Sequence, residues 1–143
     1  MISVIATVLN EGESLRGLMD SLAAQTRLPD EIVVADGGST DQTLTILREY
    51  SARLPLRVIE APGSSISAGR NRAIDAAQGD LIAVTDAGVI LAPEWLESLA
   101  EPLINDEMLA VVGGFFEADP QTIFEAALGA TTLPAVEDVR PDR

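Results

Sequence analysis

The chain has 143 residues, about the length of one domain, and its 47% hydrophobic content is sufficient to bury a core. It contains no Cys, His or Lys, which excludes disulfides, thiol and histidine catalysis, Cys/His zinc sites, Schiff-base chemistry and a P-loop lysine. The net charge of −14, with arginine as the only basic residue type, disfavours nucleic acids and anionic lipids as partners.

Apolar runs and helical repeats alternate from the first residue. Short runs rich in β-branched residues predict buried strands, and apolar residues three or four apart between Gly and Pro turns predict helices. The predicted strands cover residues 2–9, 31–35, 56–60, 80–85 and 109–113. The predicted helices cover residues 13–25, 41–53, 67–78, 93–104 and 121–128.

This alternation predicts an α/β fold, a three-layer sandwich in which helices cover both faces of a mainly parallel, Rossmann-like sheet. Residues 1–143 contain no repeat, low-complexity segment or internal linker, so we expect a single domain. In such sheets the ligand lies outside the carboxyl ends of the strands. The residues directly after each strand are therefore the candidate site.

Polar and acidic residues stand at three of these strand ends. Asn10 and Glu11 follow the first strand, Asp36 the second and Asp86 the fourth. Neighbouring carboxylates repel one another unless a cation or hydroxyl donors lie between them. Carboxylates in this arrangement can therefore bind ribose hydroxyls or a divalent metal such as Mg²⁺ or Mn²⁺. The alternative is that an Asp in such a place is a helix N-cap or a turn residue, and for Asp41 this alternative is favoured.

Two further segments offer ligand contacts. The loop with Gly38 and Ser39 presents backbone N–H groups that can approach a ligand oxygen, although it is also an ordinary loop composition. Arg70 can neutralise a diphosphate or form a surface salt bridge, and Arg72 points to a different helix face. Asn71 can hold a loop through its amide.

Five segments in register resemble the N-terminal half of the family 2 glycosyltransferases, which have the GT-A fold. The similarity runs from residue 2 to about residue 114. The five segments correspond to the family's first strand with its Asn-Glu turn, its Leu-x-x-Gln-Thr helix end, its Asp-Asp-Gly-Ser-Thr-Asp block, its Ala-Arg-Asn segment and its Ala-x-Gly-Asp turn. In this chain they are residues 3–11, 22–26, 31–41, 68–71 and 77–80.

The resemblance implies a nucleotide-sugar donor in the crevice, with Thr7, Leu9 and Asp36 at the base, Arg70 at the diphosphate and Asp86 at ribose or metal. It also implies sugar transfer to the hydroxyl of a saccharide or lipid-linked acceptor, usually with inversion, in envelope polysaccharide or glycolipid synthesis. The complete set of implied nucleotide-sugar-binding residues is Thr7, Leu9, Asn10, Glu11, Asp36, Gly38, Ser39, Arg70, Asn71, Asp86 and Gly88.

Two positions depart from the family pattern, and both remove a carboxylate. The Asp-Asp pair after the second strand reads Asp36-Gly37, and the Asp-x-Asp after the fourth strand reads Asp86-Ala87-Gly88. The last Asp of that trio usually contacts the metal, which glycine cannot do. We therefore expect weak divalent metal binding, with the ion held through Asp86, phosphates and water; the alternative is that no ion is bound.

The length of the chain also departs from the family. Residues 1–114 correspond to the nucleotide-sugar-binding half, and the acidic remainder, 115–143, is short for an acceptor side, so we expect a truncated piece that does not turn over alone. The pair Glu137-Asp138 comes too early for the family's acidic pair, which places the general base beyond Arg143. A catalytically silent nucleotide-binding or assembly module is the alternative function.

Other classes fit the sequence less well. A phosphoacceptor receiver domain needs a lysine, and a dinucleotide oxidoreductase needs Gly-x-Gly-x-x-Gly after the first strand. No leader peptide or membrane span of roughly 20 apolar residues is visible, so a cytoplasmic location is expected, with membrane association of a longer protein left open. Four apolar residues either pack in the core or form a homodimer surface. These are Val111, Val112, Phe115 and Phe116.

Overall fold

A computed structural model describes residues 1–133, without the side chain of Thr132. The chain divides into two compact units, Met1–Val112 and Gly113–Arg143, and each is described by itself. The pair Glu137-Asp138 lies outside the described residues. Within the described part, no helix combines the length and apolar character needed to cross a membrane.

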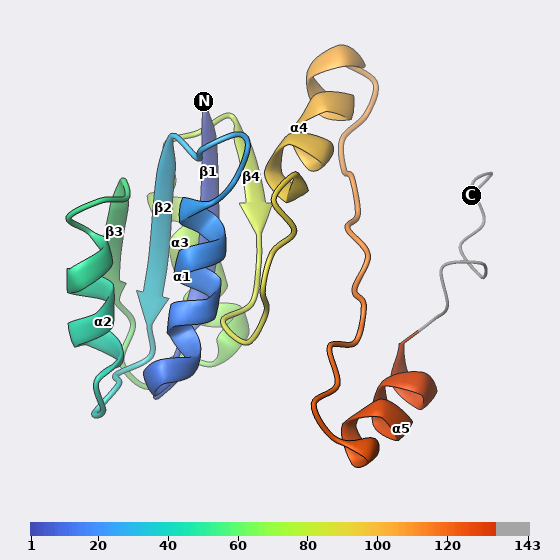
Figure 1. Ribbon diagram of the computed structural model, residues 1–143. Coiled ribbons are helices and arrows are strands. Elements are labelled where there is room, and N and C mark those ends of the chain that lie inside the picture. Colours follow the sequence, from blue (N-terminus) through green and yellow to red (C-terminus); the bar gives the residue numbers. More distant parts are fainter. Residues whose placement is uncertain (134–143) are drawn as a thin grey trace. The chain divides into compact units, whose positions relative to one another are not determined.

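The first unit is built on a four-stranded parallel sheet with the order β3-β2-β1-β4 (Figure 1). Four of the five predicted strands are confirmed, with bounds that differ by no more than one residue at either end. The strands are β1 (Ile2–Val8), β2 (Glu31–Asp36), β3 (Leu56–Glu60) and β4 (Leu81–Val84). In the register, Ile5 of β1 lies beside Val33 of β2 and Val84 of β4. All four carboxyl ends therefore lie at one edge of the sheet.

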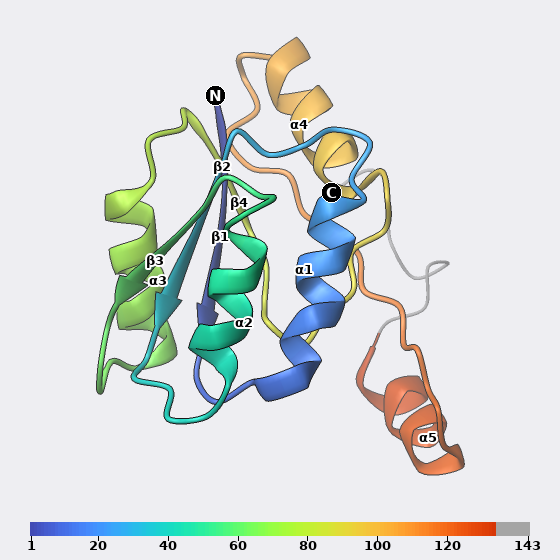
Figure 2. The same ribbon diagram turned by 60° about the vertical axis from the view of Figure 1, so that its left-hand side comes forward.

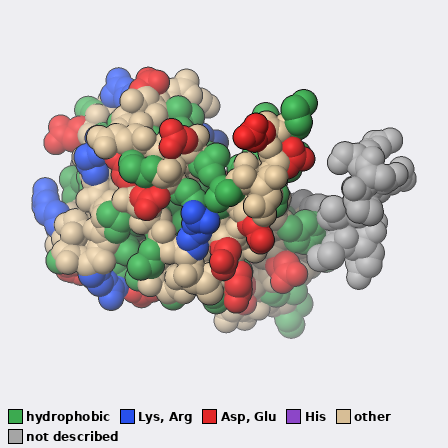
Figure 3. Space-filling model, turned by 90° about the horizontal axis from the view of Figure 1, so that it is seen from above, with side chains coloured by type: hydrophobic (Ala, Val, Ile, Leu, Met, Phe, Trp, Pro, Cys, Tyr) green, Lys and Arg blue, Asp and Glu red, His purple; other side chains and the backbone are tan. Residues whose placement is uncertain are grey.

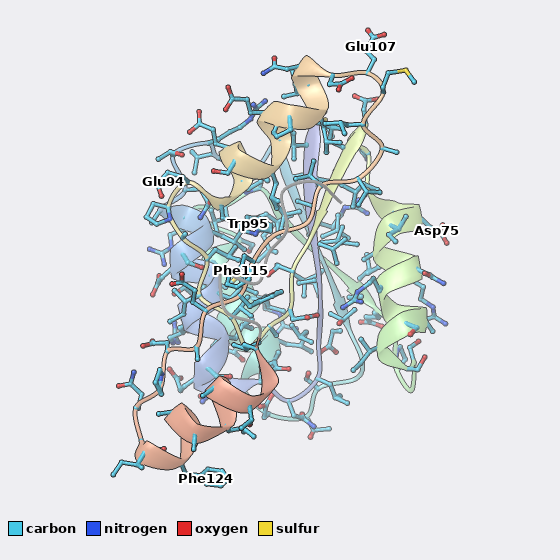
Figure 4. All side chains as sticks on the ribbon, turned by 90° about the vertical axis from the view of Figure 1, so that its right-hand side faces the viewer. Asp75, Glu94, Trp95, Glu107, Phe115 and Phe124 are labelled. Atoms are coloured by element: carbon cyan, nitrogen blue, oxygen red, sulfur yellow. The ribbon has the colours of Figure 1, made fainter. Side chains whose placement is uncertain are left out.

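Helices cover both faces of this sheet, as the alternation of strands and helices predicts (Figures 1 and 2). A 3₁₀ turn, η1 (Gly12–Ser14), leads into α1 (Leu15–Ala23), which packs with α2 (Thr43–Tyr50) and α4 (Trp95–Asn105) over a large core on one face. On the other face α3 (Ile66–Ala76) packs through Ala73 on Ile5, Val33 and Ala35. Figure 4 shows Asp75 of α3 and Trp95 of α4 on opposite sides of the sheet. The fold is the predicted three-layer α/β sandwich.

The predicted fifth strand, residues 109–113, is wrong. These residues have no regular secondary structure, and Val111 is 82% exposed. A strand forms only where its backbone groups pair with a neighbouring strand, and the described residues make no such pairing with this segment. An apolar β-branched run therefore forms a strand only where the tertiary structure places it beside the edge of a sheet.

The described part of the second unit contains one helix, α5 (Ile123–Thr132), which extends past the predicted end at residue 128. Thr122 and Glu125 form a capping box at its start, with Glu125 N–H donating to Thr122 Oγ1 over 3.2 Å. Phe115, Phe116 and Phe124, which are all the phenylalanines of the chain, are exposed. The core-packing interpretation is therefore wrong for Val111, Phe115 and Phe116, while the homodimer stays a prediction.

Candidate functional site

A pocket of about 590 Å³ opens at the carboxyl edge of the sheet in the first unit. Its lining comes from the ends of β1 and β2, the segment after β3, the first turns of α3 and the loop after β4. This is the position at which parallel α/β sheets bind ligands, because the loops that leave the strands converge there. Six of the predicted site residues line this pocket. They are Thr7, Leu9, Glu11, Arg70, Asp86 and Gly88.

Asn10 and Ser39, by contrast, hold the loops behind the pocket and do not line it. The Asn10 N–H donates to Ser39 Oγ over 2.9 Å, and Thr40 N–H donates to Asn10 Oδ1 over 2.8 Å. Asn10 adopts a φ of 55°, a left-handed conformation that asparagine tolerates better than most residues. These bonds join the turn after β1 to the loop after β2. Asn71 is exposed on α3 and also lies outside the lining.

The prediction that Asp36 lines the base pocket differs from the structure. Asp36 is the last residue of β2 and only 3% exposed, and its neighbours Ala35 and Gly37 line the pocket instead. The Asp36 carboxylate accepts the backbone N–H groups of Gly38 and Ser39, each over 3.0 Å. Because successive strand residues face opposite sides of a sheet, a single-residue extension of β2 directs Asp36 away from the face of Ala35.

Gly38 likewise has a role in the loop, not in the lining. Its φ of 102° belongs to the left-handed region, where a side chain would be strained. This conformation allows the loop to turn tightly enough for the N–H of Ser39 to reach the Asp36 carboxylate. Asp36, Gly38 and Ser39 therefore fix the shape of the loop after β2.

Arg70 and Asp86 meet at the pocket. Arg70 Nη2 lies 2.7 Å from Asp86 Oδ1, and the two side chains are 37% and 61% exposed. They come from α3 and from the loop after β4, sixteen residues apart in the sequence. The salt-bridge alternative for Arg70 is confirmed, while its contact with a diphosphate stays a prediction for a side chain that lines the pocket.

Asp41 stands in the turn before a helix, which agrees with its favoured interpretation as an N-cap or turn residue. Its Oδ1 accepts the N–H of Thr43, the first residue of α2, over 2.9 Å, and hydrogen bonds from Thr43 hold the pKa of Asp41 below its usual range. The buried Thr43 Oγ1 in turn accepts the N–H groups of Glu11 and Gly12 over 2.9 and 3.1 Å. Thr43 thereby fixes the backbone that carries Glu11, a role that sequence reasoning missed.

A second missed element is a clamp made by Gln25 and Thr26. Gln25 is buried, its Nε2 donates to Ala92 O over 2.7 Å, and its Oε1 accepts the Leu96 N–H over 2.9 Å. Thr26 N–H donates to Pro93 O over 2.9 Å. The clamp ties the end of α1 to the segment between Gly88 and α4. The Leu-x-x-Gln-Thr resemblance marked these residues, but only the tertiary contacts show what they hold.

The start of α3 is the third missed feature. Ser64, Ser65 and Gly69 line the pocket, and Ser65 caps α3 by accepting the Ala68 N–H over 3.3 Å. A Cβ on Gly69 would lie 3.3 Å from Thr7 Cγ2, so glycine allows α3 to lie close against β1. A helix N-terminus presents free N–H groups and the positive end of the helix dipole, which favour an anion. Ser64 and Ser65, three and two residues before the start of the predicted helix, were the available signal.

The described residues do not form a protein cage for a divalent metal. Two carboxylates, those of Glu11 and Asp86, line the pocket, and Asp86 is already paired with the Arg70 guanidinium. Gly88 supplies no oxygen ligand from a side chain. Across residues 1–133, no three acidic side chains are grouped as a metal site would require. Mg²⁺ and Mn²⁺ depend on such oxygen ligands, so the donor set does not fit a resident ion held by these residues.

The face in Figure 3 carries acidic side chains among its arginines and no continuous basic patch. Together with the net charge of −14, this distribution is unlike the basic surfaces that bind nucleic acid.

Several known proteins resemble this chain. Residues 3–128 match the model of the family described as "Glycosyl transferase family 2". An uncharacterised glycosyltransferase of Escherichia coli, YibD, is 32% identical over 108 residues, which are 75% of this chain and 31% of that protein. Validoxylamine A glucosyltransferase of Streptomyces hygroscopicus subsp. limoneus is 33% identical over 103 residues, or 69% of this chain and 23% of that protein.

Several solved structures have a fold similar to that of this chain. TarS 1–349 of Staphylococcus aureus in complex with UDP-GlcNAc superposes with a TM-score of 0.66 and 32% identity, covering 73% of this chain and 31% of that one. The mannosyltransferase PcManGT of Pyrobaculum calidifontis, in complex with GDP-Man and Mn²⁺, has a TM-score of 0.60 and 27% identity, covering 64% and 29%.

The chain thus spans between about a quarter and a third of the length of these relatives. Its structural neighbours are GT-A glycosyltransferases, which confirms the expected fold. Because the family match extends over residues 3–128 of 143, this chain belongs to glycosyl transferase family 2.

Proposed function

We propose that the pocket of the first unit binds the nucleoside diphosphate part of a nucleotide-sugar donor. We further propose that the chain is the donor-binding part of a glycosyltransferase that transfers the sugar to an acceptor hydroxyl. The observation that carries this proposal is the convergence of Thr7, Leu9, Arg70 and the start of α3 on one pocket at the carboxyl edge of the sheet. Family membership and the donor complexes of the structural neighbours support it.

The lining separates into an apolar and a polar part, which suits a nucleotide. Leu9, Ala35 and Ala61 offer apolar surface for a base, and Gly37 leaves room beside Leu9. The start of α3 and Arg70 offer N–H groups and positive charge for the phosphates. We place the base against the strand ends and the diphosphate at α3.

In the proposed reaction, the acceptor hydroxyl displaces the nucleoside diphosphate from the anomeric carbon, with inversion. Negative charge develops on the leaving diphosphate, and a guanidinium such as Arg70 stabilises that charge more in the transition state than in the ground state. A carboxylate outside the described residues would take the hydroxyl proton. The acceptor is proposed to be a saccharide or a lipid-linked saccharide of envelope polysaccharide or glycolipid synthesis.

Isothermal titration of the 143-residue chain with UDP and GDP tests the pocket assignment. Leu9→Glu is the informative variant, because it places a negative charge in the lining at a side chain that is already 54% exposed. Leu28→Glu is the matched control, since Leu28 is 60% exposed and lies outside the lining. We expect Leu9→Glu to weaken binding at least tenfold and Leu28→Glu to leave it unchanged. Equal affinities for both variants would contradict the assignment.

The second candidate function is a catalytically silent nucleotide-binding or assembly module. The glycine at position 88 favours it, because that position offers no carboxylate to the site. Incubation of a chain that includes the expected general base with UDP-glucose or GDP-mannose separates the two candidates. Release of nucleoside diphosphate from either donor supports the enzyme, whereas binding without release supports the silent module.

A further inference from the structure

The ion pair between Arg70 and Asp86 occupies the place where the proposed function needs a free positive charge. Arg70 is the only basic side chain among the described residues that line the pocket, and its Nη2 lies 2.7 Å from Asp86 Oδ1. Glu11 adds a second carboxylate to the lining. A diphosphate that enters this pocket therefore meets one guanidinium, which a carboxylate already holds.

The usual solution to such crowding of negative charge is a divalent cation between carboxylates and phosphates. Here the donor set argues against that solution, since position 88 is glycine and Asp86 already has a cationic partner. A second carboxylate beside Asp86 would be needed to hold an ion firmly against the competing guanidinium.

We infer that the donor's diphosphate displaces Asp86 from Arg70, so that Arg70 supplies the counter-charge for the diphosphate without an ion held by the protein. This inference rests on the proposed function. A guanidinium binds phosphate oxygens through two parallel N–H bonds, and it can exchange one anion for another because both use the same fork of donors. The first turn of α3 adds backbone N–H groups on the same side of the pocket.

The replacement of Asp86 by a diphosphate at Arg70 costs little free energy because the ion pair is partly exposed. An ion pair between solvent-exposed side chains contributes little to stability, so Asp86 releases Arg70 without a large loss. Asp86 then acts as an internal competitor of the ligand. Its removal should strengthen the binding of a nucleoside diphosphate, which is the opposite of what a metal ligand or a ribose-binding carboxylate would show.

Isothermal titration of the 143-residue chain with UDP and GDP in EDTA tests this inference. We expect Asp86→Asn to tighten binding by about two- to five-fold, and Arg70→Gln to weaken it by about ten-fold or more. The control is Arg72→Gln, an exposed arginine of the same helix outside the lining, which should leave affinity unchanged. In separate titrations without EDTA, addition of Mn²⁺ should change the affinity of the unmodified chain by less than two-fold. Urea unfolding of each variant verifies that it folds.

The outcomes are distinguishable. Binding that appears only with Mn²⁺, or that Asp86→Asn abolishes in a folded protein, overturns the inference and leaves the nucleotide-binding proposal standing. An unchanged affinity in Arg70→Gln also overturns it. If neither UDP nor GDP binds under any condition, the proposed function itself is wrong, and the inference falls with it.

Discussion

The two ends of the same sheet are built in contrasting ways. At the amino end, Glu31 accepts hydrogen bonds from Ser3 Oγ, the Gln78 N–H and Arg57 Nη2 over 2.7, 2.9 and 2.8 Å, and Ser3 Oγ accepts the Gly79 N–H over 2.9 Å. At the carboxyl end, Arg70 and Asp86 form one partly exposed pair beside a pocket. One end of the sheet thus joins β1, β2, β3 and the segment after α3 by short hydrogen bonds, while the other end leaves its charged groups accessible to a ligand.

The largest expected effect comes from filling the close contact at the amino end. A Cβ on Gly79 would lie 2.7 Å from Ser3 N and Ser3 Oγ and 2.8 Å from Met1 O, and two of these atoms belong to the backbone. We expect Gly79→Ala to lower the free energy of unfolding by about 3 kcal/mol, measured by urea denaturation. Gly88→Ala is the control at the other end, since nothing lies within 4 Å of its Cβ position. Equal free energies of unfolding for the two variants would show that the amino end of the sheet is not packed more tightly than the carboxyl end.

The next effect depends on pH. Partial burial alone would raise the pKa of Glu31, but the hydrogen bonds from Arg57, the Gln78 N–H and Ser3 outweigh it and hold the pKa below its usual range. A depressed pKa in the folded state means that the carboxylate stabilises the protein fully above its unfolded pKa of about 4.5, and that this contribution disappears as the pH falls through the folded value.

Glu31→Gln should therefore cost about 2 kcal/mol near pH 7. The difference in unfolding free energy between this variant and the unmodified chain should shrink as the pH falls below 4.5. Urea denaturation at a series of pH values measures both quantities. A difference that stays constant across the series would show that the charge of Glu31 does not stabilise this end of the sheet.

The smallest expected loss of stability concerns the clamp at the end of α1, which holds the segment that follows Asp86 and Gly88. Gln25→Leu removes the bonds to the part-buried Ala92 O and to the buried Leu96 N–H, and leaves both backbone groups without these partners. We expect a loss of about 1–2 kcal/mol in urea denaturation, together with weaker UDP or GDP binding, because the clamped segment follows Asp86 and Gly88. Glu97→Gln, which alters only an exposed bond to Thr26, should change neither quantity. Unchanged nucleotide binding in Gln25→Leu would show that the clamp does not support the pocket.

The sequence alone determined the layered α/β class, four strands and the edge of the sheet where a site would lie. These features follow from local patterns, since an apolar β-branched run, a helical repeat and a turn residue act over a few positions. Thr7, Leu9, Arg70 and Asp86 reach one pocket because parallel strands bring their carboxyl ends to one edge.

The remaining features depend on tertiary contacts. Residues 109–113 have the composition of a strand but no partner to pair with, and pairing depends on residues far away in the chain. Asp36 is directed away from the pocket because it is the last residue of β2, and successive side chains of a strand face opposite sides of the sheet. The local pattern ends the strand one residue earlier. The bond from Arg70 to Asp86 joins two elements whose meeting no local pattern specifies. Composition and periodicity fix which elements form, whereas the packing of the whole sheet fixes which side chains face one another.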